Sequence, residues 1–386
     1  MSVTAPRGFV AAGVAAGLKA SGRPDLGLLL SEQPASAAGL FTRNAFAAAP
    51  VEICRRRLLD GTARAVVANS GQANAGTGPP GFDDAEAVTT AVAHSLGIEA
   101  TDVLPVSTGV IGPRLRVDAV VAGVEEASGV LHTLGGPEFA QAIMTTDTVA
   151  KQTVVEADGF TVGGCAKGAG MIAPDLATLL VFLTTDAACS PALARDALRH
   201  GAAPVWNALT VDNCPSTNDT VLLLANGASG HEAGPDELAE AVAEATRDLA
   251  AQVVADAEGA TTSIVVQVDG AVSDADARRV GTAIAGSMLV KTAVFGKDPN
   301  PGRILQAIGA SGARFRPEAV VASLGRVQVI AAGAIPPQFD PAGCAAAMKE
   351  REVVIRVTVG VGDGRATAFG CDLGYEYVRI NGEYTT

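Results

Sequence analysis

The chain has 386 residues, of which 48% are apolar and 18% charged, so it can bury large hydrophobic cores and is not a disordered protein. Its formal net charge is −13, and no basic stripe with interleaved aromatic residues occurs, which argues against nucleic-acid binding. No apolar run reaches the roughly 18 residues that a membrane-spanning helix needs, so no membrane partner is expected.

Cysteine and histidine residues indicate neither a metal site nor a redox site. The six cysteines are dispersed without a C-x-x-C pair, and the four histidines lack the spacing of metal ligands. We therefore expect no metal. Dispersed, reduced cysteines in a chain of this length are typical of cytoplasmic proteins, which is the expected location.

The first half of the chain alternates short apolar runs with turns and alanine-rich segments. Short apolar runs predict strands, and longer runs with helical periodicity predict helices. The expected strands are 26–30, 38–41, 50–53, 64–68 and 103–106, and the expected helices are 83–94, 118–126 and 138–144.

The second half combines longer helices with strand pairs. Because helices and strands alternate irregularly, we expect a layered α/β fold, an α+β sandwich, rather than a parallel barrel. The expected helices are 191–200, 235–254, 273–285 and 304–308, and the expected strands are 179–183, 220–225, 263–268, 291–295, 319–323, 326–330, 352–359 and 366–369.

Two glycine-rich segments match the G-x-G-x-x-G/A pattern of dinucleotide-binding loops, at 76–81 and 168–173. That pattern binds a phosphate only where a helix follows the glycines directly and the backbone approaches closely. Pro79 and Pro80 interrupt the first segment, and Pro174 with a predicted strand follows the second. We therefore reject nucleotide binding for the second segment and rank a nucleotide-binding module last among the hypotheses.

The stretch from Lys167 to Asp186 places Thr178 where a glycine-rich bend enters a buried strand. Most threonines at strand starts are structural, and no histidine partner or G-x-S-x-G motif accompanies this one. A threonine hydroxyl can act without histidine if it becomes an N-terminal residue, because its own α-amine then serves as base. That state requires a cut between Ala177 and Thr178.

The predicted strand 103–106 ends in Ser107-Thr108-Gly109. Small residues at a strand end can expose backbone N–H groups, which is what an oxyanion hole requires, although an ordinary turn has the same composition.

Several motifs in one order resemble the ornithine acetyltransferases, also called glutamate N-acetyltransferases, of arginine biosynthesis. The resemblance covers essentially the whole chain. The matching segments are 41–44, 69–78, 107–109, 144–147, 167–180, 216–219, 256–259, 291–293, 298–300 and 381–386.

This resemblance implies self-cleavage between Ala177 and Thr178, into an α chain of residues 1–177 and a β chain of residues 178–386 that begins with the nucleophile. It implies that Thr108 and Gly109 form the oxyanion hole. The fold would follow the logic of N-terminal nucleophile hydrolases with different connectivity. The positions that match substrate-holding residues are Thr145, Lys167, Thr178, Glu258, Asn381 and Thr386.

The implied reaction moves acetyl from N2-acetylornithine to Thr178 and then to glutamate, without a bound cofactor. Glu258 would pair with a substrate ammonium, and Lys167 would either favour a carboxylate or lower the pKa of the threonine amine. Whether acetyl-CoA also donates acetyl stays open. The resemblance further implies a heterotetramer of two α and two β chains.

Two positions depart from the family pattern: Pro301 stands where many relatives have tryptophan, and Gly76 where many have cysteine. Both weaken assumptions about the pocket walls. The alternative function is a self-processed aminopeptidase or amidase that transfers acyl groups to water.

Overall fold

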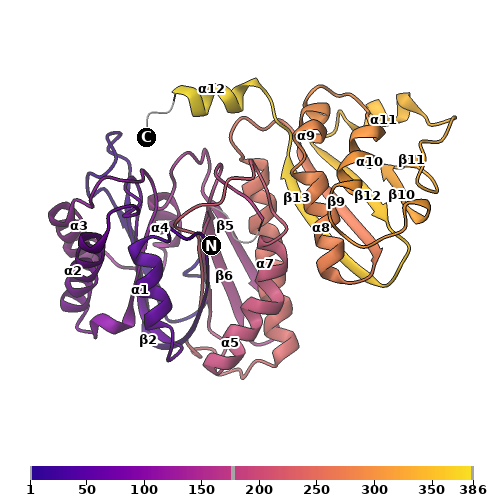
Figure 1. The fold of residues 1–386 in the computed structure, drawn as a ribbon. Coiled ribbons are helices and arrows are strands. Elements are labelled where there is room, and N and C mark those ends of the chain that lie inside the picture. The colour runs from indigo at the N-terminus through magenta and orange to yellow at the C-terminus, as the bar shows by residue number, and fades with distance from the viewer. Residues whose placement is uncertain (1, 175–178, 384–386) are drawn as a thin grey trace.

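The computed structural model describes residues 2–174 and 179–383, which form two lobes. Figure 1 shows the large lobe, which contains both sides of the 175–178 gap, and the small lobe, which begins at β9. The last helix, α12 (Tyr375–Glu383), leaves the small lobe and runs back over one end of the large lobe (Figure 1).

The large lobe is built on an eight-stranded sheet in the order β4-β3-β2-β8-β7-β6-β5, with β1 paired to β2. The pairs β3–β4 and β7–β8 are parallel, and the others are antiparallel. The strands are β1 (Phe9–Val14), β2 (Leu26–Phe41), β3 (Thr62–Asn69), β4 (Val103–Ser107), β5 (Lys151–Glu156), β6 (Thr161–Lys167), β7 (Leu180–Thr185) and β8 (Thr220–Ala225).

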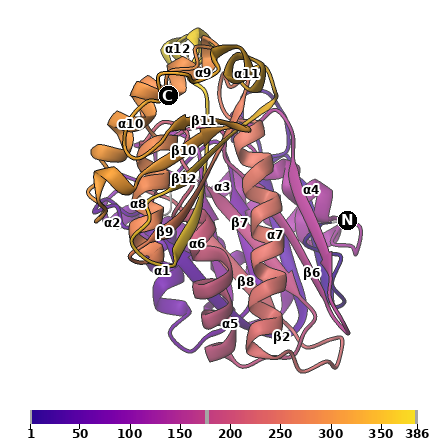
Figure 2. The ribbon, with the colours of Figure 1, turned by 90° about the vertical axis from the view of Figure 1, so that its right-hand side faces the viewer.

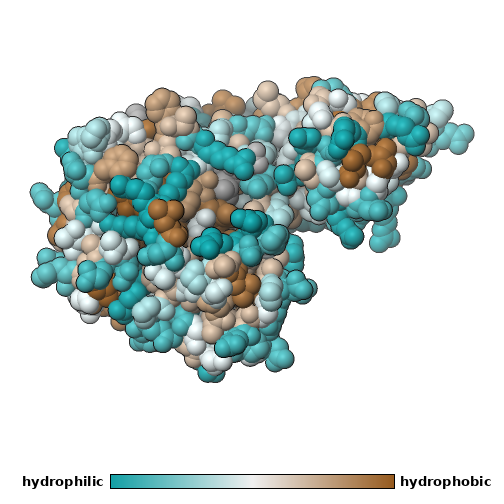
Figure 3. Space-filling model, turned by 60° about the horizontal axis from the view of Figure 1, so that its bottom comes forward, coloured by the Kyte–Doolittle hydropathy of each residue, from teal (hydrophilic) through white to brown (hydrophobic). Residues whose placement is uncertain are grey.

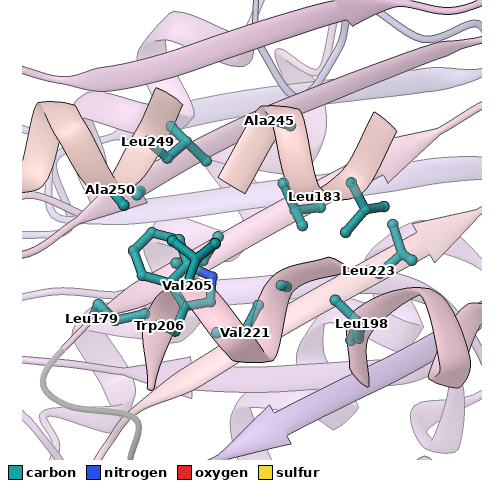
Figure 4. Close-up of a cluster of buried hydrophobic side chains, with 14 of the residues drawn as sticks. Leu179, Leu183, Leu198, Val205, Trp206, Val221, Leu223, Ala245, Leu249 and Ala250 are labelled. Atoms are coloured by element: carbon teal, nitrogen blue, oxygen red, sulfur yellow. The ribbon is translucent and has the colours of Figure 1, made fainter. Parts of the chain in front are cut away.

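Strand β7 lies in the middle of this sheet and is buried on both faces, which explains its continuous apolar run. Val181 and Leu183 pack into the core beneath α7, as Figure 4 shows for Leu183 beside Ala245 and Leu249. On the opposite face, Phe182 meets Phe139 of α4 edge to face, with ring centroids 5.0 Å apart. Because both faces of β7 are packed, this strand is a rigid support for a functional residue placed at its start.

Helices cover both faces of the large sheet. Helix α7 runs the length of the lobe beside β6 and β8 (Figure 2), and α5 and α6 pack with it. Helices α1 and α4 pack against the other face, and α2 and α3 cover the β1–β3 end. Their bounds are α1 (Ala49–Arg57), α2 (Pro79–Leu96), α3 (Val117–Gly129), α4 (Gly136–Ala142), α5 (Pro191–Ala197), α6 (Ala203–Trp206) and α7 (Pro235–Ala255).

The small lobe is a two-layer structure with a five-stranded sheet in the order β11-β10-β12-β9-β13. Alternate residues of β9, such as Ile264, Val266 and Val268, are buried under the helices, so one face carries the core. The strands are β9 (Ser263–Ala271), β10 (Val321–Leu324), β11 (Val327–Ile330), β12 (Glu352–Thr358) and β13 (Gly364–Cys371), and the helices are α8 (Asp274–Ala285), α9 (Met288–Phe295), α10 (Pro301–Gly309) and α11 (Pro341–Ala347).

The layered α/β architecture expected from the sequence is confirmed, and several element predictions are wrong. The run 291–295 was expected as a strand but belongs to helix α9, and 50–53 belongs to helix α1. The two short runs 26–30 and 38–41 are parts of one long strand, β2. Strands β5 and β6 were not expected at all.

The face in Figure 3 is largely hydrophilic, with small separate apolar patches on both lobes. Among the helices of the described residues, none combines the length and the apolarity needed to cross a membrane.

Candidate functional site

A pocket opens at the end of the large sheet where β4 and β6 finish and β7 and β8 begin. Its cavity has a volume of about 120 Å³. Six residues singled out by the sequence lie in its wall. The lining residues are Thr108, Gly109, Ile111, Thr145, Thr146, Lys167, Gly170, Met171, Ser216, Thr217, Asn218, Glu258, Ile380 and Asn381.

Lys167 is the buried cation of this pocket. It is the last residue of β6, pairs with Leu180 of β7, and is only 2% exposed. Its Nζ donates to the Thr108 hydroxyl at 3.4 Å, and no carboxylate of the described residues lies within 4 Å of it. Burial therefore lowers the pKa of Lys167, although Asp147 opposes this shift.

The Thr108-Gly109 turn has two hydrogen-bond donors at the pocket, the Thr108 hydroxyl and the Gly109 N–H. The Thr108 N–H donates to the Asn69 carbonyl at 2.9 Å, so the hydroxyl is the group that Thr108 can offer. The Gly109 N–H donates to none of the residues that the structure describes. Because Lys167 donates to the Thr108 oxygen, the hydroxyl hydrogen of Thr108 is directed elsewhere.

Gly109 has to be a glycine at this turn. Its φ is +126°, and a Cβ there would lie 2.3 Å from the Gly71 carbonyl carbon. The backbone of the neighbouring loop thus packs directly against the turn, which holds the Gly109 N–H in place.

An amide and hydroxyl network fixes the end of β4. The Ser107 hydroxyl donates to Asn69 Oδ1 at 2.6 Å, and Asn218 Nδ2 donates to the carbonyls of Ser107 at 2.8 Å and Ala73 at 2.6 Å. Three loops that are far apart in the sequence are therefore held as one unit behind Thr108.

A buried ion network supports the loop that carries Thr145. Lys151 is fully buried, and its Nζ lies 2.6 Å from both Asp147 Oδ1 and Asp256 Oδ2. Asp147 also accepts the N–H groups of Thr145 at 2.9 Å and Gly168 at 2.7 Å. Burial alone would raise the pKa of Asp147, but Lys167 and Lys151 lower it to about 2.

Helix α12 closes one side of the pocket. Asn381 Nδ2 donates to Glu258 Oε2 at 2.8 Å, and the Tyr377 hydroxyl donates to Asp212 Oδ2 at 3.0 Å. The Glu258 carboxylate leaves no space for a side chain at residue 170, because a Cβ on Gly170 would lie 2.5 Å from it. The site therefore combines residues from both lobes.

A buried carboxyl group lies directly behind the start of β7. Asp219 Oδ1 accepts the Leu179 N–H at 3.2 Å, and Oδ2 has no hydrogen-bond partner among the described residues. Burial raises the pKa of Asp219 well above its usual range. Leu179 is the first described residue after the gap, so Asp219 holds the chain where it re-enters the sheet.

Comparison with known proteins identifies the family. The model of the ArgJ family matches residues 10–386. The chain is 48% identical to the arginine biosynthesis bifunctional protein ArgJ of Mycolicibacterium paratuberculosis, over 100% of this chain and 96% of that protein. The chain belongs to the ArgJ family.

Two solved structures are similar to parts of this ArgJ-family chain. The arginine biosynthesis bifunctional protein ArgJ from Bacillus halodurans shares 38% identity with a TM-score of 0.51, over 53% of this chain and 98% of that one. An ornithine acetyltransferase from Mycobacterium tuberculosis, complexed with ornithine, shares 48% identity with a TM-score of 0.44, over 46% of this chain and 95% of that one. Membership of the family confirms the resemblance found in the sequence and identifies the protein as an enzyme.

The structure brings together six of the residues that the ArgJ resemblance singled out: Thr108, Gly109, Thr145, Lys167, Glu258 and Asn381. Ala177, Thr178 and Thr386 lie outside the described residues, so their roles stay predictions. No group of three or more metal-binding side chains occurs among residues 2–174 and 179–383.

The sequence did not assign a role to Asp147, Lys151, Asp219 or Asp212. Asp147 and Asp219 lie in segments that match the family, but a segment match does not reveal which carboxylate is buried. The sequence signal that could have indicated a buried carboxylate is an acidic residue directly before a predicted apolar strand, such as Asp219 before β8.

We expect Asp147→Asn to lower the free energy of unfolding by about 3 kcal/mol at pH 7, because it leaves the buried Lys151 ammonium with one counterion. The folded-state pKa of Asp147, about 2, lies below the value near 3.8 of an unperturbed aspartate. Its ionised form therefore stabilises the fold above pH 4, and that contribution is lost as the pH falls toward 2.

Urea unfolding of wild type and variant at pH 7, 4 and 3 measures this effect. The difference between the two proteins should shrink as the pH falls. A constant difference would show that the charge of Asp147 is not responsible. Asp196→Asn is the matched control, because Asp196 forms an exposed pair with Arg199 and its loss should change stability by less than about 0.5 kcal/mol.

Proposed function

We propose that the chain cuts itself between Ala177 and Thr178 and then transfers acetyl from N2-acetylornithine to glutamate through an acetyl ester of Thr178. The products are ornithine and N-acetylglutamate. The observation that carries this proposal is the pocket at the start of β7, where a buried lysine, two hydrogen-bond donors at Thr108 and Gly109 and a carboxylate–amide pair line one cavity.

Self-cleavage needs only the hydroxyl and a strained or well-held peptide bond. The Thr178 hydroxyl adds to the Ala177 carbonyl, the C–N bond breaks, and an ester with a free α-amine forms. Water hydrolyses this ester, which leaves a carboxylate on Ala177. The solved ArgJ chain from Bacillus halodurans supports this, because 98% of that chain corresponds to only 53% of this one.

Acetyl transfer then proceeds in two balanced steps. The Thr178 hydroxyl attacks the acetyl carbonyl and gives its proton to the Thr178 α-amine, whose usual pKa of about 7.7–8.0 suits this exchange. The bond between acetyl and the ornithine nitrogen breaks, and the proton leaves with ornithine. The glutamate amine next attacks the acetyl ester, and the proton returns to the threonine oxygen.

The oxyanion of each step lies beside Thr108 and Gly109. The Thr108 hydroxyl and the Gly109 N–H donate hydrogen bonds to it, and they are already held in place, so no rearrangement opposes the reaction. The Lys167 ammonium, 3.4 Å from the Thr108 oxygen, strengthens that donor and adds positive charge near the developing anion.

Glu258 and Asn381 bind the amino-acid part of the substrate in this proposal. The Glu258 carboxylate pairs with the side-chain ammonium of ornithine, and Asn381 keeps that carboxylate in place. Thr145 and Thr386 complete the binding residues.

Three further features belong to the same proposal. Acetyl-CoA serves as a second acetyl donor, which accounts for a bifunctional enzyme of the kind that the relatives' names describe. The cleaved α and β chains assemble as an α2β2 heterotetramer. The enzyme works in the cytoplasm.

The test is to supply N2-acetylornithine and glutamate to the purified protein and to measure N-acetylglutamate, ornithine and free acetate. We expect ornithine and N-acetylglutamate in equal amounts. Ornithine with free acetate would instead indicate an amidase that uses water as acceptor. No release of ornithine would reject the proposal.

A further inference from the structure

A second and larger cavity adjoins the pocket described above. Its volume is about 640 Å³, and it lies between the β1–β2 connection and the segment from α4 to β5. Thr145 lines both cavities. The lining residues are Lys19, Ser21, Arg23, Pro24, Gln141, Met144, Thr145, Asp147, Thr148 and Ala150.

The β1–β2 connection presents two cations to this cavity. Asp25 is fully buried and folds the connection, because its carboxylate accepts the N–H groups of Ala16, Leu18 and Lys19 at 2.6–2.8 Å. Lys19 Nζ donates to the Pro24 carbonyl at 2.8 Å. Neither Lys19 nor Arg23 has a carboxylate oxygen within 4 Å among the described residues.

The charge of this cavity is opposite to that of the chain. The protein carries a net charge of −13, yet two of the three charged side chains in the cavity wall are cationic. The third, Asp147, already forms an ion pair with Lys151 and accepts hydrogen bonds from two backbone N–H groups. Burial lowers the pKa of Lys19 to about 8, although Asp25 and Asp147 oppose this shift.

A ligand that fits both cavities has an acyl group at one end and negative charge at the other. The acyl end would lie at Thr108 and Lys167, and the negative end at Lys19 and Arg23, on the two sides of Thr145, which lines both cavities. Phosphate groups are the common anions that arginine and lysine bind together.

We propose that Lys19 and Arg23 bind the phosphate groups of a phosphorylated acyl thioester, such as acetyl-CoA, while its acetyl group lies in the Thr108–Lys167 pocket. This inference rests on the proposed function, because it requires the Thr178 nucleophile. The Thr178 hydroxyl attacks the thioester carbonyl, the carbon–sulfur bond breaks, and the thiol leaves with the hydroxyl proton. The acetyl ester that results is the same one that acetylornithine forms.

The experiment compares wild type with Lys19→Gln/Arg23→Gln, using glutamate as acceptor and three acetyl donors. These are acetyl-CoA, S-acetyl-N-acetylcysteamine, which has the thioester without phosphate, and N2-acetylornithine. We expect the KM for acetyl-CoA to rise about 10- to 100-fold in the variant, because two charge-assisted contacts are lost. The kcat/KM of the other two donors should change by less than about two-fold.

Matched variants guard against indirect effects. Lys349→Gln/Arg351→Gln removes the same two charges from exposed positions of the small lobe and should leave every donor unaffected. Arg23→Gln alone changes an exposed side chain and should raise the KM for acetyl-CoA less than the double variant does. This single variant keeps the test valid if the double variant folds poorly.

Three results would overturn the inference. The first is a wild-type enzyme that uses acetylornithine but neither uses acetyl-CoA nor is inhibited by free CoA. The second is an unchanged KM for acetyl-CoA in the double variant. The third is an equal loss with all three donors. If wild type fails with acetylornithine itself, the proposed function fails instead.

Discussion

Thr178→Ala is expected to remain one chain of 386 residues and to lose acetyl transfer, by a factor on the order of 10⁴ to 10⁶ in kcat. Alanine has no hydroxyl to attack the Ala177 carbonyl, so neither the cut nor the acetyl ester can form. A denaturing gel, mass spectrometry of the intact protein and the acetylornithine–glutamate assay measure the two effects separately.

Thr178→Ser is the matched control, because it keeps a hydroxyl and removes one methyl group. It should still cut itself and transfer acetyl, more slowly than wild type. Wild-type β chains should begin at Thr178 on N-terminal sequencing. A single intact 38.6 kDa species in fully active wild-type protein would reject self-cleavage, and so would normal turnover by the alanine variant.

The second large effect is expected for Lys167→Met, which should lower kcat by about 10²- to 10³-fold, because it weakens the Thr108 donor and removes positive charge beside the oxyanion. Methionine has a similar length and no charge, so the Thr108 hydroxyl loses its 3.4 Å partner while the packing is retained. The free energy of unfolding should not fall, because a buried ammonium without a carboxylate partner costs stability.

The pH profile of this variant separates the two roles considered for Lys167. If the ammonium lowers the pKa of the Thr178 amine, its loss raises that pKa, and the acid limb of kcat/KM moves to higher pH. If Lys167 binds a substrate carboxylate, the limb stays and the KM for glutamate rises. Lys291→Met is the matched control, because Lys291 is equally buried but donates to the Cys371 carbonyl in the small lobe. A kcat that falls equally in both variants would reject a specific role for Lys167.

The sequence predicted elements well where the local pattern and the tertiary environment agree. The apolar run before Thr184 is strand β7, and the Gly234-Pro235 start is that of helix α7. The segment 291–295 was also predicted as a strand but belongs to helix α9, whose first turn Ser287 caps by accepting the Val290 N–H at 3.3 Å. The cap lies outside the run on which the prediction was based.

Strand β6 was missed because of Gly163 and Gly164, which are unfavourable in strands. Its neighbours explain the glycines, since a Cβ on Gly163 would lie 2.3 Å from the Ser2 carbonyl oxygen. A contact between residues that are 161 positions apart leaves no pattern in the local sequence. The same holds for the Lys151–Asp256 pair, which supports the site over a separation of 105 residues.

The order of strands in the large sheet determines how the protein could refold after self-cleavage. Strands β7 and β8, which follow the proposed cut, lie between β2 and β6, which precede it, and six residue pairs join the strands at each of these two borders. The two products would therefore be interleaved rather than merely attached. An uncut chain reaches this arrangement by closing loops within itself, whereas separated fragments would have to meet in solution first. Refolding of the denatured mature enzyme would then depend on protein concentration, while folding of the precursor would not.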